Sequence, residues 1–301
     1  MGADLASHFP QSRECFDRAS IVLGYDLLER VGRASADELK ETRLSQPAIF
    51  TANVVIYRAV ATLGMQPIVS AGHSFGEYCS LTIADAIDFD EAIRMVNERA
   101  LAMGEAADIT PGLMAAVIGL EEAAVDEVCK QAREVSGARV DIGNLNTLTQ
   151  IVVSGDAAGV EAACEIAKER GAKRVRILNV SGAWHSTLME PAMPRFAKAV
   201  ASAKLRIPSF TVISNVTARP YTSVDEIREC LLASLCARVR WHETAMTLAK
   251  LGPDYIIECG ASEVLAPMMK RLREARNAHI VHIADAAGLE DLRSEIGSLT
   301  A

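Results

Sequence analysis

A serine flanked by glycines is the first point where this sequence has residue types and spacing suited to chemistry: Gly72-His73-Ser74-Phe75-Gly76. The run before it, residues 67–71, is short, apolar and partly β-branched, which predicts a buried strand. Residues 77–87 have the pattern of a helix. A G-x-S-x-G between a strand and a helix makes a sharp turn that exposes the serine as a nucleophile. Ser74 is therefore the candidate nucleophile, with a chance match or an ordinary glycine-flanked turn as the alternative.

The neighbours of Ser74 in this turn have roles that can be predicted from their types. We expect Gly72 and Gly76 to be required, because a side chain at either position would crowd a backbone that folds tightly beneath the serine. The amide of Phe75 is expected at the N-terminus of the following helix, where an N–H group can donate to an oxyanion. Together these features indicate covalent catalysis through Ser74.

A serine is a poor nucleophile unless a base takes its proton, so one of the six histidines should lie beside it. His185 is the best candidate, because it stands in Ser181-Gly182-Ala183-Trp184-His185-Ser186, where a strand is expected to end and a helix to begin. Connections of this kind commonly carry functional residues. A hydrogen-bonded structural histidine is the alternative. Paired with Ser74, His185 is the predicted general base.

Arg99 is a cation without an obvious partner on its own helix. Its neighbours three and four residues away are Met95, Val96, Ala102 and Met103, so no carboxylate on that helix can neutralise it. The planar guanidinium suits bidentate binding of a carboxylate, and one candidate is the carboxylate of a substrate. An arginine that reaches solvent, or one that pairs with a distant acidic residue, is the alternative.

The elements that must position these residues are expected to be helices in the first part of the chain, with most strands of the parallel sheet late in it. Helical periodicity covers residues 1–66, in three stretches: 16–31, 35–43 and 47–63. No strand is expected before 67–71, and the next strands of the same sheet are expected only at 210–214 and 255–258. The sequence therefore predicts an α/β fold with a short parallel sheet and many helices.

A different pattern interrupts this α/β region. Residues 110–179 read as strand, helix, strand, strand, helix, strand, which is the split βαβ order of a ferredoxin-like unit. We therefore expect a small inserted domain at 110–179 and a larger domain formed by 1–109 and 180–301. Short hinges are expected near 110–112 and 179–182, where turn-forming residues gather.

Composition limits the classes of partner and compartment. The chain has 301 residues and a formal net charge of −8, which argues against nucleic acid or an anionic membrane as the main partner. The seven cysteines are scattered without a C-x-x-C, as is typical of reduced thiols, and offer no metal-ligand spacing. No apolar run is long enough to span a membrane. We expect a cytoplasmic protein that uses neither a metal nor an organic cofactor.

Several segments taken together resemble the malonyl-CoA:acyl carrier protein transacylase family. The resemblance covers nearly the whole chain in the family's order. Its motifs are Gln46-Pro47-Ala48, the Gly72–Tyr78 segment, Arg99, Gly112–Val117, Asn144-Leu145-Asn146, Gln150–Gly155, His185–Met189, Val239-Arg240-Trp241 and Glu258-Cys259-Gly260.

The resemblance implies a hydrolase-like α/β core, a ferredoxin-like insert and ping-pong chemistry. In that chemistry Ser74 attacks the thioester of malonyl-CoA, His185 relays the proton, and the malonyl ester passes to the phosphopantetheine thiol of acyl carrier protein. Arg99 would hold the free carboxylate of the malonyl group. Trp184 would line the acyl pocket, where relatives often have a smaller aromatic residue or a serine, so selection between malonyl and branched analogues stays open.

Two departures from the family pattern bear on this expectation. The family normally opens with a strand ending in Phe-Pro-Gly-Gln-Gly, whose glutamine helps to form the oxyanion hole, whereas this chain begins with the sequence that follows it. We expect a start codon placed too late and a true chain that begins upstream. Ser234 and Ala237 stand where relatives have Gln and Asn. That change is tolerable if a backbone carbonyl makes the contact to His185 there.

Two alternatives to malonyl transfer are an acyl hydrolase on the same fold and a catalytically impaired scaffold that binds carrier protein. We expect a monomer, acting in fatty acid or polyketide synthesis, with malonyl-CoA and acyl carrier protein as partners. Two basic clusters suit an acidic partner, with solvated surface as the alternative: Lys173, Arg174 and Arg176, and Lys270, Arg271, Arg273 and Arg276.

Overall fold

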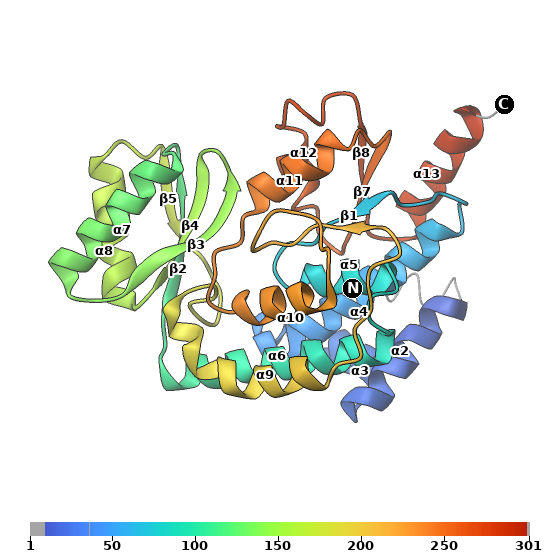
Figure 1. The fold of residues 1–301 in the computed structure, drawn as a ribbon, viewed down its shortest axis with the longest axis horizontal. Helices are drawn as coiled ribbons and strands as arrows, with labels where there is room; N and C mark the ends of the chain where they lie inside the picture. The colour runs from blue at the N-terminus through green and yellow to red at the C-terminus, as the bar shows by residue number, and fades with distance from the viewer. Residues whose placement is uncertain (1–9, 36, 300–301) are drawn as a thin grey trace.

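The computed structural model of the 301-residue chain describes residues 10–35 and 37–299 as a mixed α/β protein (Figure 1). Helices are more abundant than strands. The α-helices are α2 (Pro10–Leu23), α3 (Leu27–Arg33), α4 (Thr42–Ala61), α5 (Gly76–Ile83), α6 (Phe89–Ile109), α7 (Glu122–Ser136), α8 (Ala157–Glu169), α9 (Met193–Ser202), α10 (Val224–Ala233), α11 (Trp241–Lys250), α12 (Ala266–Met269) and α13 (Ala286–Leu299). The strands are β1 (Val69–Ser70), β2 (Leu113–Ile118), β3 (Val140–Thr147), β4 (Gln150–Gly155), β5 (Arg174–Ile177), β6 (Thr211–Val212), β7 (Tyr255–Cys259) and β8 (His279–Ile283). Two 3₁₀ helices, η1 (Glu38–Lys40) and η2 (Thr187–Ala192), complete the elements.

The N-terminal region is helical as predicted, but its helices begin and end elsewhere. The stretch predicted at 16–31 is divided into α2 and α3 at Gly24, which has a positive φ of 79°. Of the stretch predicted at 35–43, residues 38–40 form η1 and only the last two residues lie in α4, which begins at Thr42 and covers most of the stretch predicted at 47–63. The buried side chain of Gln46 donates to the Thr42 hydroxyl over 2.6 Å, which stabilises the turn ahead of Pro47. The Ser35–Glu38 pair makes reciprocal capping hydrogen bonds at η1.

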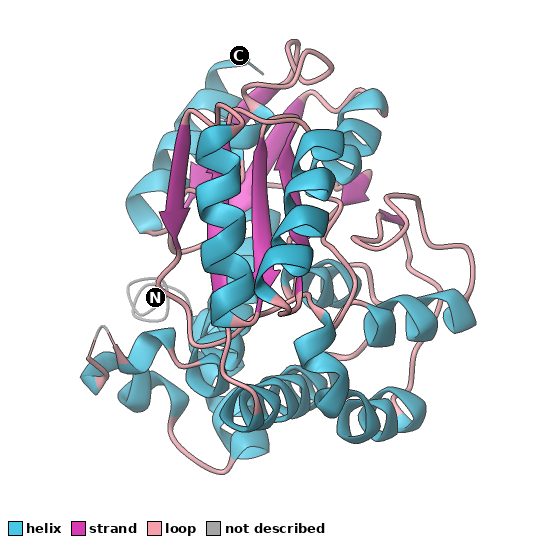
Figure 2. Ribbon diagram, turned by 90° about the vertical axis from the view of Figure 1, so that its left-hand side faces the viewer, coloured by secondary structure: helices cyan, strands magenta, loops and turns pink. Residues whose placement is uncertain are grey.

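A four-stranded antiparallel sheet has the order β3-β4-β2-β5, and its strands are separated along the chain by α7 and α8. Figure 2 looks at this sheet with the two helices crossing in front of one face. The buried layer between them contains Val117, Ile142 and Val153 from the strands and Val128 and Ala163 from the helices. Each of the six elements expected between 110 and 179 is therefore present.

The remaining strands form two parallel pairs, β1 with β6 and β7 with β8. The pairing at β1 covers two residues, so the strands expected at 67–71 and 210–214 are shorter than predicted. In the described part of the chain the two pairs are not hydrogen-bonded to each other. The expectation of a missing opening strand concerns residues at and before 1–9, which lie outside the described residues.

The turn between β1 and α5 depends on one glycine. A Cβ built on Gly72 would lie 2.0 Å from the backbone of Gly76, so no other residue fits there. A Cβ on Gly76 would meet nothing within 4 Å, so the expectation that both glycines are required is wrong for Gly76. A side chain on Gly72 would collide with the backbone of Gly76, at the start of α5, whereas a side chain on Gly76 would extend into open space. Ser74 has a φ of 55°, which strains a residue that carries a side chain.

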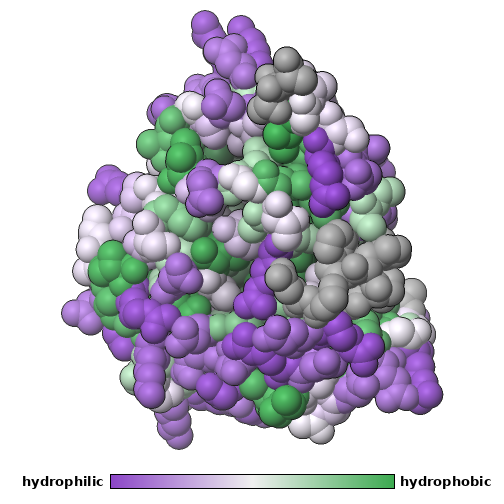
Figure 3. All heavy atoms as spheres, turned by 90° about the vertical axis from the view of Figure 1, so that its right-hand side faces the viewer, coloured by the Kyte–Doolittle hydropathy of each residue, from purple (hydrophilic) through white to green (hydrophobic). Residues whose placement is uncertain are grey.

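On the face that carries α13, polar side chains are interspersed with apolar patches (Figure 3). Among the described residues no helix has the length and apolar character needed to cross a membrane. The seven cysteines form no disulfide bonds.

Replacing Gly72 and Gly76 separately by Ala tests this account of the turn. Gly72→Ala should lower the free energy of unfolding by about 1–3 kcal/mol, because the backbone must open to admit the methyl group. Gly76→Ala should leave it within about 1 kcal/mol of the parent protein. Urea unfolding of the two variants measures both values, and equal losses would show that the close approach at Gly72 does not constrain the turn.

Candidate active site

Ser74 and His185 meet at the centre of the candidate site. The Oγ atom of Ser74 lies 2.8 Å from Nε2 of His185, although the two residues are 111 positions apart. Ser74 stands in the turn between β1 and α5, and His185 stands between β5 and η2, also with a positive φ of 59°. The His185 side chain is buried. The structure thus brings together the predicted nucleophile and the predicted base.

The second nitrogen of His185 fixes its tautomer. Nδ1 lies 2.8 Å from the backbone carbonyl of Ser234, and because a carbonyl only accepts, Nδ1 carries the proton. Nε2 is then the unprotonated nitrogen that faces the Ser74 hydroxyl. This contact uses the backbone of Ser234, so the Ser234 side chain does not take part in it.

His185 is held in its neutral form. Burial, followed by the positive charge of Arg99, lowers the pKa of His185 to about 3. A neutral imidazole beside a hydroxyl can accept its proton, and near neutral pH the base is therefore available without a prior deprotonation.

Arg99 projects from α6 to the same point. Its side chain is 1 % exposed, Nη1 donates to Oε1 of Gln46 over 2.6 Å, and Nη2 lies 3.3 Å from Oγ of Ser74. Its Nε–H has no hydrogen-bond partner, and within the described residues no carboxylate lies at ion-pair distance from it. A buried cation without a paired anion is costly. The site therefore has unused capacity to bind an anion beside the nucleophile.

The side chain of Asn215 makes two hydrogen bonds to the backbone of the turn. Its Oδ1 accepts from the backbone N–H of Ser74 over 2.8 Å, and its Nδ2 donates to the carbonyl of Gly72 over 2.5 Å. Sequence reasoning did not select Asn215. The available signal was its position directly after the strand predicted at 210–214, where polar residues of an α/β sheet commonly reach the site.

Glu77 and Tyr221 form a buried pair behind Asn215. The carboxylate of Glu77 accepts from the Asn215 backbone N–H over 3.0 Å and from the Tyr221 hydroxyl over 2.6 Å. Burial raises the pKa of Glu77 to about 7, against the opposing effect of these hydrogen bonds and of Arg99. Glu77 belongs to the segment Gly72–Tyr78, but its sequence gave no sign of this role.

The two other predicted site residues, Phe75 and Trp184, are the sequence neighbours of Ser74 and His185. Phe75 follows Ser74, and its N–H has no acceptor among the described residues, whereas the N–H of Ser74 is already bound by Asn215. Trp184 precedes His185, and its ring packs so closely on Gly182 that a Cβ there would lie 2.5 Å from it. The structure therefore brings Ser74, His185 and Arg99 into contact and leaves Trp184 beside them.

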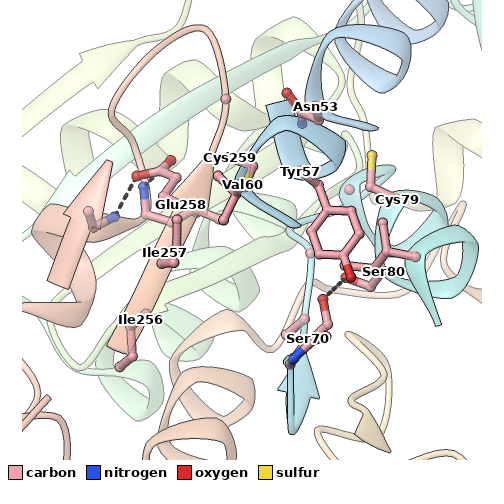
Figure 4. A pocket seen from close by; sticks show the side chains of 18 of the residues that line it. Asn53, Tyr57, Val60, Ser70, Cys79, Ser80, Ile256, Ile257, Glu258 and Cys259 are labelled. Atoms are coloured by element: carbon pink, nitrogen blue, oxygen red, sulfur yellow. Dashed lines mark hydrogen bonds between the residues drawn. The ribbon is translucent and has the colours of Figure 1, made fainter. Parts of the chain in front are cut away.

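A cavity of about 1120 Å³ borders the turn (Figure 4). Side chains of α4, α5 and β7 line it, including Tyr57, Val60 and Ile257, and Ser70 donates to Ser80 at its edge. Phe75 borders this cavity, but Ser74, Arg99 and His185 do not. Ser74, Arg99 and His185 therefore form a site that is distinct from this cavity.

The arrangement is suited to acyl transfer to a serine. A strained serine at a helix start, a neutral histidine at hydrogen-bond distance and an unpaired buried cation can form an ester from an acyl group that carries a negative charge. Among the described residues no cluster of His, Cys, Asp and Glu could hold a metal ion.

Comparisons with known proteins agree with this chemistry. The chain is 39% identical to a malonyl CoA-acyl carrier protein transacylase of Haemophilus influenzae over 274 residues, which covers 90% of this chain and 87% of the relative. It is 37% identical to the enzyme of the same name from Escherichia coli over 293 residues, which covers 96% of this chain and 94% of the relative.

Solved structures give the same result. The malonyl CoA-acyl carrier protein transacylase of Coxiella burnetii superposes with a TM-score of 0.92 at 36% identity, over 98% of this chain and 92% of that one. A malonyl-transacylase solved in complex with its type II PKS acyl-carrier protein superposes with a TM-score of 0.91 at 36% identity, over 98% and 94% of the two chains. The family model for the acyl transferase domain matches residues 1–289. The chain belongs to the acyl transferase domain family.

Proposed function

We propose that this protein transfers a malonyl group from malonyl-CoA to the phosphopantetheine thiol of acyl carrier protein through an ester on Ser74. The observation that carries the proposal is the buried Arg99 guanidinium, which lies 3.3 Å from the Ser74 hydroxyl and has no carboxylate of the described residues at ion-pair distance. The names of the relatives support the same substrates.

In the first half-reaction the Ser74 Oγ attacks the thioester carbonyl of malonyl-CoA. The hydroxyl proton passes to Nε2 of His185, which lies 2.8 Å away and is neutral. The carbon–sulfur bond then breaks, the sulfur of CoA takes the proton from His185, and malonyl-Ser74 remains.

In the second half-reaction the thiol of the carrier protein replaces CoA. His185 accepts the thiol proton, the sulfur attacks the carbonyl carbon of the ester, and the bond from that carbon to Ser74 breaks. The Ser74 oxygen recovers the proton from His185. The free N–H of Phe75 would donate to the negative oxygen that develops in both half-reactions.

Arg99 gives this site its preference for a dicarboxylic acyl group. In a malonyl group one methylene separates the carboxylate from the reacting carbonyl, so a cation beside the nucleophile can bind the carboxylate while the carbonyl is attacked. Arg99 meets this requirement, because Nη2 lies beside Ser74 and Nε has no partner. Trp184, next to His185, would limit the size of a substituent on that methylene.

The architecture is proposed to be a hydrolase-like core of residues 1–109 and 180–301 with a ferredoxin-like insert at 110–179. The order β3-β4-β2-β5 with two helices on one face supports the insert, and the two parallel strand pairs with the turn at Ser74 support the core. Hinges near 110–112 and 179–182 would join them.

The same comparisons support a proposal for the acyl acceptor and for the pathway in which the protein acts. The relatives are transacylases and include a complex with an acyl-carrier protein, so the hydrolase and scaffold alternatives are not favoured. The exposed Arg174 and Arg176 on the edge strand β5 would suit an acidic carrier protein. We propose a monomer that acts in the cytoplasm, in keeping with its cysteine thiols, in fatty acid or polyketide synthesis, and the relatives include a polyketide biosynthesis protein.

Replacing the nucleophile tests the function directly. With radiolabelled malonyl-CoA and holo acyl carrier protein, the parent protein should move label to the carrier, and Ser74→Ala should lower that rate by at least about 10³-fold. Ser136→Ala, at the end of α7, is the matched control and should transfer at the parent rate. Release of free malonate without labelled carrier would instead identify a hydrolase.

Replacing Arg99 tests its proposed role in selectivity. Arg99→Ala should lower the ratio of malonyl to acetyl loading by about 10- to 10²-fold, since hydrogen bonds to a charged group contribute about 1.5–3 kcal/mol. Arg94→Ala, on the exposed side of α6, controls for loss of charge on that helix. Equal losses of malonyl and acetyl loading would remove Arg99 from the carboxylate-binding role.

A further inference from the structure

The backbone of Ser74 needs support from outside its own segment. Its φ of 55° lies in the left-handed region that residues with a side chain rarely adopt. Such a conformation persists only where surrounding contacts hold it. Within the turn, Gly76 N–H donates to His73 O and Glu77 N–H to Ser74 O, and these bonds fix the start of α5 without reaching back to Gly72.

Asn215 supplies two contacts that span the strained residue. Its carboxamide oxygen accepts from Ser74 N–H over 2.8 Å, and its carboxamide nitrogen donates to Gly72 O over 2.5 Å. One planar group thus bonds the backbone on both sides of His73. A shift of the Ser74 backbone toward ordinary dihedral angles would stretch the bond to the Ser74 amide.

Asn215 is itself held in place by two backbone hydrogen bonds, one of them to a carboxylate that is held in turn. The Glu77 carboxylate accepts from its backbone N–H, and its backbone carbonyl accepts from Arg240 N–H over 3.0 Å. Tyr221 donates to the same carboxylate over 2.6 Å. Asn215 is 1 % exposed, so its hydrogen bonds do not compete with bulk water.

We infer that Asn215 is a positioning residue, which holds Ser74 in the strained conformation that directs Oγ to His185. The inference rests on the proposed function, because it concerns the rate at which Ser74 is acylated. Asn215 also occupies the N–H of Ser74, which leaves the N–H of Phe75 as the amide of this turn that is available to an oxyanion.

The role predicts an effect on the acylation step and none on binding of the carboxylate. Asn215 makes no hydrogen bond to Arg99 or Gln46, so a variant there should leave the Arg99 guanidinium in place. A displaced nucleophile slows the reaction by on the order of 10²-fold when the shift is about 1 Å. A residue needed only for stability would change the amount of folded protein but not the rate of each folded molecule.

The test is single-turnover acylation by malonyl-CoA, measured by rapid quench and corrected for folded protein by thermal unfolding. Asn215→Leu should slow the maximal rate about 10²-fold and leave the half-saturating malonyl-CoA concentration within about threefold. Asn215→Asp keeps the acceptor for Ser74 N–H but loses the donor to Gly72 O, so it should slow acylation by about tenfold. If Asn215→Leu does not fold, the acylation rate of Asn215→Asp is the test of the inference.

Thr244→Val is the matched control. Thr244 is equally buried and donates to the carbonyl of Ser214, directly before Asn215, without touching the turn at Ser74. It should acylate within about twofold of the parent rate. A folded Asn215 variant that acylates at the rate of Thr244→Val, or that changes half-saturation in place of the maximal rate, would overturn the inference. A parent protein that is not acylated at all would overturn the proposed function instead.

Discussion

The strained backbone of Ser74 is the constraint on which the rest of the site depends. A φ of 55° costs about 1–3 kcal/mol for a residue with a side chain, and the fold meets this cost with contacts from distant segments. Gly72 allows the backbone to approach Gly76, and Asn215 bonds the turn from the segment after β6. The Ser74 hydroxyl then stands within 2.8 Å of His185.

Electrostatic effects set the protonation state of the base beside Ser74. Burial keeps His185 neutral, and the charge of Arg99, which is also buried, adds to that effect. Glu77 lies behind the turn, where it accepts two hydrogen bonds and has a raised pKa. The site therefore presents a neutral base and a buried cation beside Ser74. This arrangement favours a substrate that brings its own carboxylate.

The sequence predicted most of this site because its chemistry is concentrated in short motifs. Ser74 and His185 were found from turn and loop signals, and Arg99 from the absence of a partner on its helix. Asn215 was missed because its function is set by contacts with a segment 141 positions away, which no local pattern reports. The requirement for Gly76 was wrongly predicted, because the direction of the close approach at the turn depends on tertiary geometry.

The same distinction holds for the fold. The small antiparallel sheet was predicted element by element, since each strand and helix between 110 and 179 has a clear period and β3 pairs with β4, the next strand in the chain. Strands β1 and β6 were predicted too long, because their pairing joins segments about 140 positions apart and only two residues of each take part. Helix boundaries in the N-terminal region differ from the predicted ones near Gly24, whose φ is positive, and near Gln46, whose side chain bonds Thr42, and periodicity reports neither feature.

The most direct test of the account is to locate the covalent intermediate. After brief mixing with malonyl-CoA and acid quench, peptide mapping by tandem mass spectrometry should find a malonyl ester on Ser74. In His185→Ala the same ester should form far more slowly, because no other described base contacts the Ser74 hydroxyl. A malonyl group on a different residue, or a Ser74 ester that forms equally fast without His185, would contradict the account.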